Sequence, residues 1–296
     1  MKENARIPVT VECSDGYPLD ATFIDSSAFN AIEEQSGSPQ KKGVIVFASA
    51  LGVDCSHYFK LAEYFAQQGF DAICFNYRGT GKRPANYSEF TSSLADWGRR
   101  DVDAIIRHAS TLDLPIYYIG HSIGGQLLPL SDSSHRVQRA ILLAASAPYW
   151  ARWPGLSKIK LLLTCKLILP AAASCYRDFP SAKFGLGNLV IPSNLVNEWC
   201  RWMSKPDYFL EDSFGLGAKA MFRECEVPIR AYAFSDDAMA PLANIEKLVS
   251  FWGGDKKEIA MRNPEGLKVK RIGHSGFLRP NFQTPFWEEL SDFLSR

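Results

Sequence analysis

The chain has 296 residues, of which 46% are hydrophobic and 22% are charged, and its formal net charge at pH 7 is +1. The composition is that of an ordinary soluble globular protein, and the length fits one large α/β domain with an insertion or two small domains. The near-zero net charge gives no electrostatic reason to expect a nucleic-acid or membrane-surface partner.

Seven cysteines are scattered along the chain without a C-x-x-C pair. Their odd number and irregular spacing argue against a disulfide framework or a zinc cluster and favour a reducing compartment. Residues 1–6 lack the apolar segment of a secretory signal. The longest apolar run, residues 156–175, contains lysines and a proline, so we do not expect a membrane span. These features predict a cytoplasmic protein.

The first part of the chain predicts a hairpin followed by strand–helix–strand. Residues 7–25 alternate in polarity around an Asp-Gly turn signal, and the polar residues 26–42 predict an exposed loop. Residues 43–48 are continuously apolar, as in a strand buried on both faces. Apolar residues at helical spacing over 58–66 predict a helix, and residues 70–75 predict the next strand.

Strands and helices continue to alternate after that strand. Residues 94–111 predict a long helix, 114–119 a strand and 140–145 another buried strand. Further strands are predicted at 227–234 and 267–272, followed by a closing amphipathic helix at 286–294. This alternation favours a mostly parallel sheet with helices on both faces.

The alternation stops between residues 147 and 225, where the sequence is helical in character and dense in aromatic residues. We interpret 147–225 as an insertion that packs over the sheet, with a core formed by 1–146 and 226–296.

The pentapeptide Gly120-His121-Ser122-Ile123-Gly124 lies between the predicted strand at 114–119 and a segment that can open a helix. Gly-x-Ser-x-Gly in that context is the pattern of a nucleophile elbow. The sharp turn strains the serine backbone, and small flanking residues are needed because the neighbouring chain passes close by. Ser122 is therefore the candidate nucleophile.

A serine hydroxyl needs a base to accept its proton and an acid to orient that base. His274 lies in Gly273-His274-Ser275-Gly276, after the predicted strand at 267–272, and is the best placed of five histidines. Asp236 and Asp237 follow the strand at 227–234. Adjacent side chains point in different directions, so at most one of the two can face His274, and the other is expected to form the turn.

Gly-His-Ser-Ile-Gly-Gly, an Asp-x-x-x-Pro and a Gly-His-x-Gly-Phe, in that order, resemble the α/β-hydrolase superfamily, as does Tyr77-Arg78-Gly79-Thr80-Gly81. More narrowly, the chain looks like a poorly characterised group of bacterial capped serine hydrolases. The resemblance implies an α/β fold with a doubly wound, mostly parallel sheet and a helical cap insertion. It also implies that the acid is Asp237, which has a proline four residues later, and that Tyr77-Arg78-Gly79 is structural.

An oxyanion intermediate needs two backbone N–H donors. The residue after the nucleophile, Ile123, supplies one, and the loop after residues 44–47 supplies the other. Superfamily members often have His-Gly in that loop, whereas this chain has Ala48-Ser49, which leaves Ala50 or Leu51 as the donor; we favour Ala50.

The expected function is hydrolysis of an ester or thioester of a small-to-medium apolar acyl substrate through an acyl-enzyme, with no cofactor and no metal. Acyl transfer, cyclisation or C–C bond hydrolysis on the same three residues remain alternatives, as does a binding protein that kept the fold. The sequence contains no phosphate-binding or H-E-x-x-H motif that would indicate nucleotide or metal chemistry.

Overall fold

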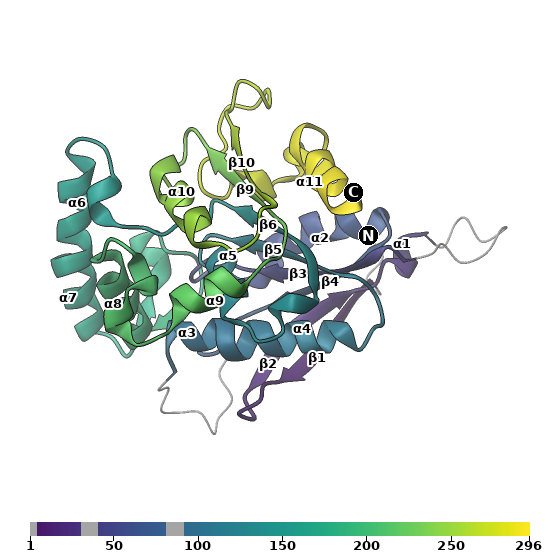
Figure 1. Cartoon of the computed structure of the whole chain (residues 1–296), viewed down its shortest axis with the longest axis horizontal. Helices are drawn as coiled ribbons and strands as arrows, with labels where there is room; N and C mark the ends of the chain where they lie inside the picture. The colour runs from purple at the N-terminus through teal and green to yellow at the C-terminus, as the bar shows by residue number, and fades with distance from the viewer. Residues whose placement is uncertain (1–4, 31–40, 81–91) are drawn as a thin grey trace.

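The computed structural model of the chain describes residues 5–30, 41–80 and 92–296. Its centre is an eight-stranded sheet with the strand order β1-β2-β4-β3-β5-β6-β9-β10, and helices cover both faces (Figure 1). The first two strands form an antiparallel hairpin and β2 pairs antiparallel with β4, whereas all the other pairs are parallel.

The N-terminal part contributes the hairpin and the first crossover: β1 (Arg6–Glu12), β2 (Pro18–Ile24), the short helix α1 (Ser27–Asn30), β3 (Gly43–Ala48), a 3₁₀ turn (Cys55–Tyr58), α2 (Phe59–Gln67) and β4 (Phe70–Phe75). The next crossover is one long helical stretch with a π-helical centre, composed of α3 (Leu94–Asp96), Trp97–Val102 and α4 (Asp103–Ser110). It leads to β5 (Ile116–His121), α5 (Gly124–Leu127) and β6 (Val137–Leu143).

The C-terminal part completes the sheet with β9 (Ile229–Phe234), α10 (Leu242–Phe251) and β10 (Lys257–Arg262), and ends in a π-helical turn (Gln283–Trp287) and α11 (Glu288–Ser295). α2 and α11 pack on one face of the sheet and α4 packs on the other. The predicted hairpin, the buried strands, the helices at 58–66 and 94–111 and the closing helix are confirmed. Of the loop predicted at 26–42, Ser27–Asn30 form a helix, and residues 31–40 lie outside the described residues.

The strand predicted at 267–272 is wrong. The last strand is β10, which pairs parallel with β9 from Lys257 to Arg262, and residues 263–275 form turns and irregular chain. β10 is the edge strand of the sheet, and two of its three exposed positions carry charged side chains, Lys257 and Glu258. It therefore lacks the continuous apolar pattern that marks the central strands.

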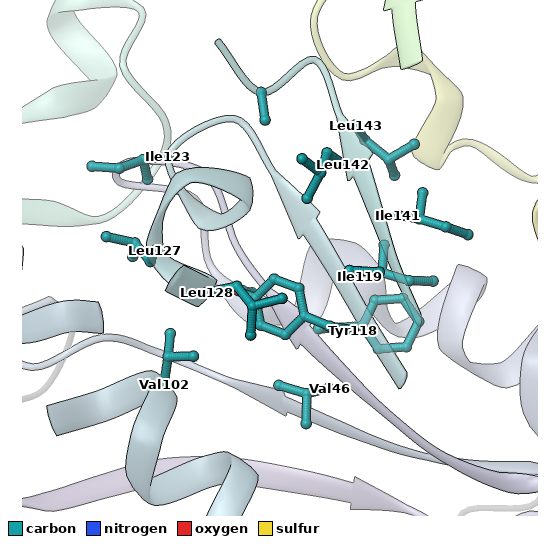
Figure 2. Close-up of a cluster of buried hydrophobic side chains, with 14 of the residues drawn as sticks. Val46, Val102, Tyr118, Ile119, Ile123, Leu127, Leu128, Ile141, Leu142 and Leu143 are labelled. Carbon is teal, nitrogen blue, oxygen red and sulfur yellow. The ribbon is translucent and has the colours of Figure 1, made fainter. Parts of the chain in front are cut away.

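The core of the sheet consists of apolar side chains that alternate between the two faces of β3, β5 and β6. Figure 2 shows Tyr118 of β5 with Leu128 and Val102 on the face covered by α4, whereas Ile119 and Ile141 point the other way. All five side chains are fully buried. This packing fixes the position of the turn that follows β5.

The segment between β6 and β9 contains four helices and a two-stranded sheet: α6 (Ser157–Leu163), a π-helical turn (Thr164–Ile168), α7 (Leu169–Ser174), β7 (Asp178–Pro180), β8 (Val190–Pro192), α8 (Ser193–Met203) and α9 (Ala218–Glu224), with 3₁₀ turns between them. The small sheet was not anticipated from sequence. α6 and α7 form the outer edge of the molecule, at the left of Figure 1. Among the described residues, no helix is both long enough and apolar enough to cross a bilayer.

Candidate active site

Ser122 occupies a strained turn directly after β5. Its φ is +54°, in the left-handed region that non-glycine residues rarely adopt, and its N–H donates to Leu143 O at 2.9 Å. A Cβ added to Gly124 would lie 2.2 Å from Ala48 O, and one added to Gly120 would lie 2.5 Å from the Cα of Gly125. The glycines of the motif are therefore required by the close approach of backbone, as the sequence predicted.

The turn lies where the direction of chain winding reverses. The chain runs from β3 to β4 on one side, and then crosses back to β5 on the other side of β3. In an open α/β sheet this reversal opens a crevice at the carboxyl ends of the two central strands. A cavity of about 630 Å³ lies there, and Ser122 and His274 both line it.

His274 is oriented by Asp237. The His274 Nδ1 lies 2.7 Å from Asp237 Oδ2, and the other carboxylate oxygen, Oδ1, accepts the N–H of Met239 at 2.8 Å. The Asp237 side chain is almost completely buried. Because Nδ1 is engaged with the carboxylate, Nε2 is the ring nitrogen of His274 left for other partners. Among the described residues, His274 Nε2 and the Ser122 hydroxyl share no hydrogen bond with each other.

Asp236 has a different function from its neighbour, because it fixes the loop that carries His274. Its carboxylate accepts the N–H groups of Ile272, at 2.9 Å, and of Gly273, at 3.0 Å. Since β10 ends at Arg262, the loop has no strand directly before it, and these two hydrogen bonds attach it to the end of β9. The sequence indicated a turn-forming role for one aspartate, but only the structure shows that it anchors the histidine loop.

A buried chain of hydrogen bonds runs behind the serine, and sequence reasoning missed it. The Tyr58 hydroxyl accepts the Ala50 N–H at 2.9 Å and lies 2.7 Å from His121 Nδ1. His121 Nε2 lies 2.8 Å from the backbone oxygen of His274. The chain therefore connects the loop after β3 to the backbone of the residue that faces Asp237.

The direction of each hydrogen bond between Ala50 and His274 is fixed by the two backbone groups at the ends, the Ala50 N–H and the His274 carbonyl. The carbonyl of His274 can only accept, so His121 Nε2 carries the proton, and Nδ1 must then accept from the Tyr58 hydroxyl. Burial, followed by the nearby His274, holds the pKa of His121 well below its ordinary value, so the ring stays neutral. The sequence did contain a signal for this hydrogen-bond network. It is His121, directly before the serine in Gly-x-Ser-x-Gly, together with Tyr58, which follows the loop after β3.

The same contacts bear on the two candidate oxyanion donors. The Ala50 N–H already donates to the Tyr58 hydroxyl, which argues against the preference for Ala50. Leu51 is the next residue and also lines the cavity. Within the described chain, the N–H groups of Leu51 and Ile123 donate to no other group.

The cavity wall is mainly apolar. Side chains from the β6–β9 segment, together with the loops after β3 and β10, supply this surface: Leu51, Val53, Trp153, Leu161, Leu186, Trp199, Met203 and Leu278. The exposed polar residues that line the cavity are His57, Asn188, Ser275 and Arg279. Among the described residues, no group of three or more His, Cys, Asp or Glu side chains could hold a metal ion.

The contacts of Arg78 are those of a residue that stabilises the fold, as the resemblance to the superfamily implied. Its buried guanidinium pairs with the fully buried Asp101 and with Asp15, and Trp97 Nε1 donates to its carbonyl at 3.1 Å. These contacts attach the loop after β4 to the hairpin and to the long helix. Gly81, the last residue of the motif in this loop, lies outside the described residues.

Comparison with known proteins gives a consistent result for the fold. The family model for serine aminopeptidase, S33 matches residues 39–179. The chain superposes on a soluble variant of monoglyceride lipase from Saccharomyces cerevisiae with a TM-score of 0.66, at 15% identity, covering 99% of this chain and 97% of that one. No curated protein matches the sequence.

Two further solved structures are similar over their whole length. An esterase from Exiguobacterium antarcticum gives a TM-score of 0.60 at 14% identity, covering 98% of this chain and 100% of that chain. A monoacylglycerol lipase from Paleococcus ferrophilus gives 0.57 at 15% identity, covering 94% and 98%. At these identities the likeness establishes the fold.

Proposed function

We propose that this chain, which has the α/β-hydrolase fold and matches a serine aminopeptidase family model over residues 39–179, is a serine hydrolase that cleaves an ester or thioester, with Ser122 as nucleophile, His274 as base and Asp237 as the residue that orients the base. The observation that carries the proposal is the 2.7 Å contact between His274 Nδ1 and Asp237 Oδ2 beside the cavity that Ser122 lines. The chain order Ser, Asp, His is that of the superfamily.

In the first half-reaction the Ser122 Oγ attacks the acyl carbonyl carbon while His274 Nε2 takes the hydroxyl proton. The negative charge on the carbonyl oxygen is stabilised by two backbone N–H groups, which we assign to Ile123 and Leu51. Leu51 is preferred to Ala50 because its N–H donates to no other described group. As the carbonyl re-forms, the bond to the leaving alcohol or thiol breaks, and His274 gives that group the proton.

In the second half-reaction, water replaces the leaving group. His274 Nε2 accepts one proton from the water as its oxygen attacks the acyl-enzyme carbonyl. The bond between that carbonyl carbon and Ser122 Oγ then breaks, His274 returns the proton to Oγ, and the carboxylic acid is released. Asp237 remains a carboxylate throughout and stabilises the transient imidazolium.

The apolar wall favours an acyl group without charge. Its lining residues come largely from 147–225, and we propose that this segment is a cap that selects the substrate. Each methylene group that leaves water for such a surface contributes about 0.8 kcal/mol, or roughly fourfold in binding. We therefore expect kcat/KM for p-nitrophenyl esters to rise from acetate toward medium-length chains.

A fluorophosphonate probe tests the nucleophile directly. The wild-type protein is expected to be labelled, and Ser122→Ala to remain unlabelled with its circular dichroism spectrum intact. Ser275→Ala is the matched control, because Ser275 lines the same cavity and its loss should leave labelling unchanged. Labelling of Ser122→Ala, or a folded but unlabelled wild type, would show that Ser122 is not the nucleophile.

A further inference from the structure

The outer side of the helical stretch from α6 to α7 exposes a continuous set of large apolar side chains. The exposed fractions are 81% for Leu156, 48% for Ile159, 46% for Leu163, 61% for Leu167 and 53% for Ile168. Elsewhere in the described chain, the large exposed apolar residues are scattered over separate elements. We refer to these five residues as the outer apolar face.

This face is not the side by which the helices pack on the protein. Cys165, Leu169 and Ala173 are buried in the same stretch. Leu156, Ile159, Leu163 and Leu167 follow one another at intervals of three and four residues, which places them on one side of a helix. The stretch therefore has two apolar sides, and among the described residues only the inner one is covered by other parts of the chain.

The outer apolar face lies among positive charges. Lys158, Lys160 and Lys166 are exposed and belong to the same stretch, and no Asp or Glu occurs between Asp132 and Asp178. Within the described residues, none of the three lysines forms an ion pair, so their charges are not neutralised by the protein's own carboxylates.

Apolar side chains bordered by unpaired lysines on one helix match the chemistry of a bilayer interface, where acyl chains lie below anionic headgroups. A second copy of the chain would bring the same lysines together and incur repulsion. We propose that the outer apolar face docks on the surface of a bilayer containing anionic lipids, with α6 and α7 lying in the interface and not crossing it.

The inner side of the same stretch connects the docking surface to the cavity. Leu161 lines the cavity, and the outer residues Ile159 and Leu163 lie two positions away from it on either side. A docked protein would hold its cavity wall next to the bilayer, where apolar acyl substrates concentrate. The docking itself does not depend on the proposed ester chemistry, so vesicle binding and probe labelling fail independently.

Vesicle flotation with the purified full-length protein tests the proposal. We expect binding to vesicles of phosphatidylcholine mixed with phosphatidylglycerol at low salt, at least about tenfold tighter than to phosphatidylcholine alone, and weakening as salt screens the lysines. Ile159→Ser combined with Leu167→Ser should abolish binding. Replacing Lys158, Lys160 and Lys166 together by Gln should reduce binding to the level seen with neutral vesicles.

The matched control combines Met261→Ser with Lys270→Gln, which removes an exposed apolar side chain on β10 and an exposed lysine in the loop after it, both outside the outer apolar face. It should bind vesicles like the wild type. All variants should hydrolyse a short water-soluble ester at the wild-type rate, which shows that they fold. Failure of the wild type to bind anionic vesicles would overturn the proposal. Equal vesicle binding by the variant with Ile159→Ser and Leu167→Ser would also overturn it. The same holds if the wild type does not bind lipid but forms a dimer that this variant dissociates.

Discussion

Replacing Asp236 and Asp237 by Asn, one at a time, makes the same chemical change at two adjacent positions with different contacts. Asp236 accepts two backbone N–H groups from the His274 loop, and Asp237 contacts the His274 ring. We expect Asp236→Asn to lower mainly stability, and Asp237→Asn to lower mainly kcat.

The magnitudes follow from the contacts. In Asp236→Asn one amide oxygen can still accept, whereas the amide NH₂ faces a second N–H, so one charge-assisted hydrogen bond is lost. Such bonds contribute about 1.5–3 kcal/mol, and because Asp236 is partly exposed we expect a loss of about 2 kcal/mol in the free energy of unfolding. In Asp237→Asn the amide cannot hold the ring in the same tautomer, and kcat is expected to fall roughly 10⁴-fold.

Urea unfolding and initial rates with a p-nitrophenyl ester, measured on the same preparations, separate the two effects. For Asp236→Asn we expect a kcat reduced only about tenfold, because the loop is loosened but the His274–Asp237 contact is retained. If Asp236→Asn lowered kcat roughly 10⁴-fold and Asp237→Asn left kcat near the wild-type value, the orienting acid would be Asp236. If Asp236→Asn left stability unchanged, the anchoring function of Asp236 would be refuted.

Three further outcomes are expected. In urea titrations, the free energy of unfolding of Ser122→Gly should be about 1 kcal/mol larger than that of Ser122→Ala, because glycine adopts the positive φ without strain. Equal free energies of unfolding would argue against backbone strain at this position. Gly124→Ala should abolish fluorophosphonate labelling and destabilise the fold by about 1–3 kcal/mol, since its Cβ would meet Ala48 O; a labelled, stable variant would contradict the close approach. The pKa of buried His121 is depressed, so the unfolded chain binds an extra proton and the free energy of unfolding falls as pH drops below about 6.5. In urea titrations, His121→Gln should reduce the slope of this free energy against pH by up to about 1.4 kcal/mol per pH unit. An unchanged slope would exclude His121 as the source of the pH dependence.

The central strands and the serine turn could be predicted from sequence because their causes are local. A strand buried on both faces must be continuously apolar, and a turn this sharp needs glycines at 120 and 124, so both leave direct marks in the sequence. The edge strand β10 leaves no such mark, because half of its side chains face solvent. This is why residues 267–272 were predicted as a strand in its place.

Local charge also escaped the sequence analysis. A net charge of +1 gave no reason to expect a membrane-surface partner, yet the average conceals a stretch between Asp132 and Asp178 that has basic residues and no acidic ones. Whether such a stretch matters depends on which side of a helix is covered, and that is decided by packing.

The residue types of the site and their order along the chain were determined by the sequence alone. Tertiary structure decided which groups meet: Asp237 faces His274 while Asp236 binds the loop backbone, and Tyr58 engages the Ala50 N–H, whereas the Leu51 N–H has no partner among the described residues. These contacts join residues far apart in the sequence, and their partners are largely backbone groups, which every residue carries. No pattern of side chains along the chain can specify them, because the strand order and the loop paths bring them together.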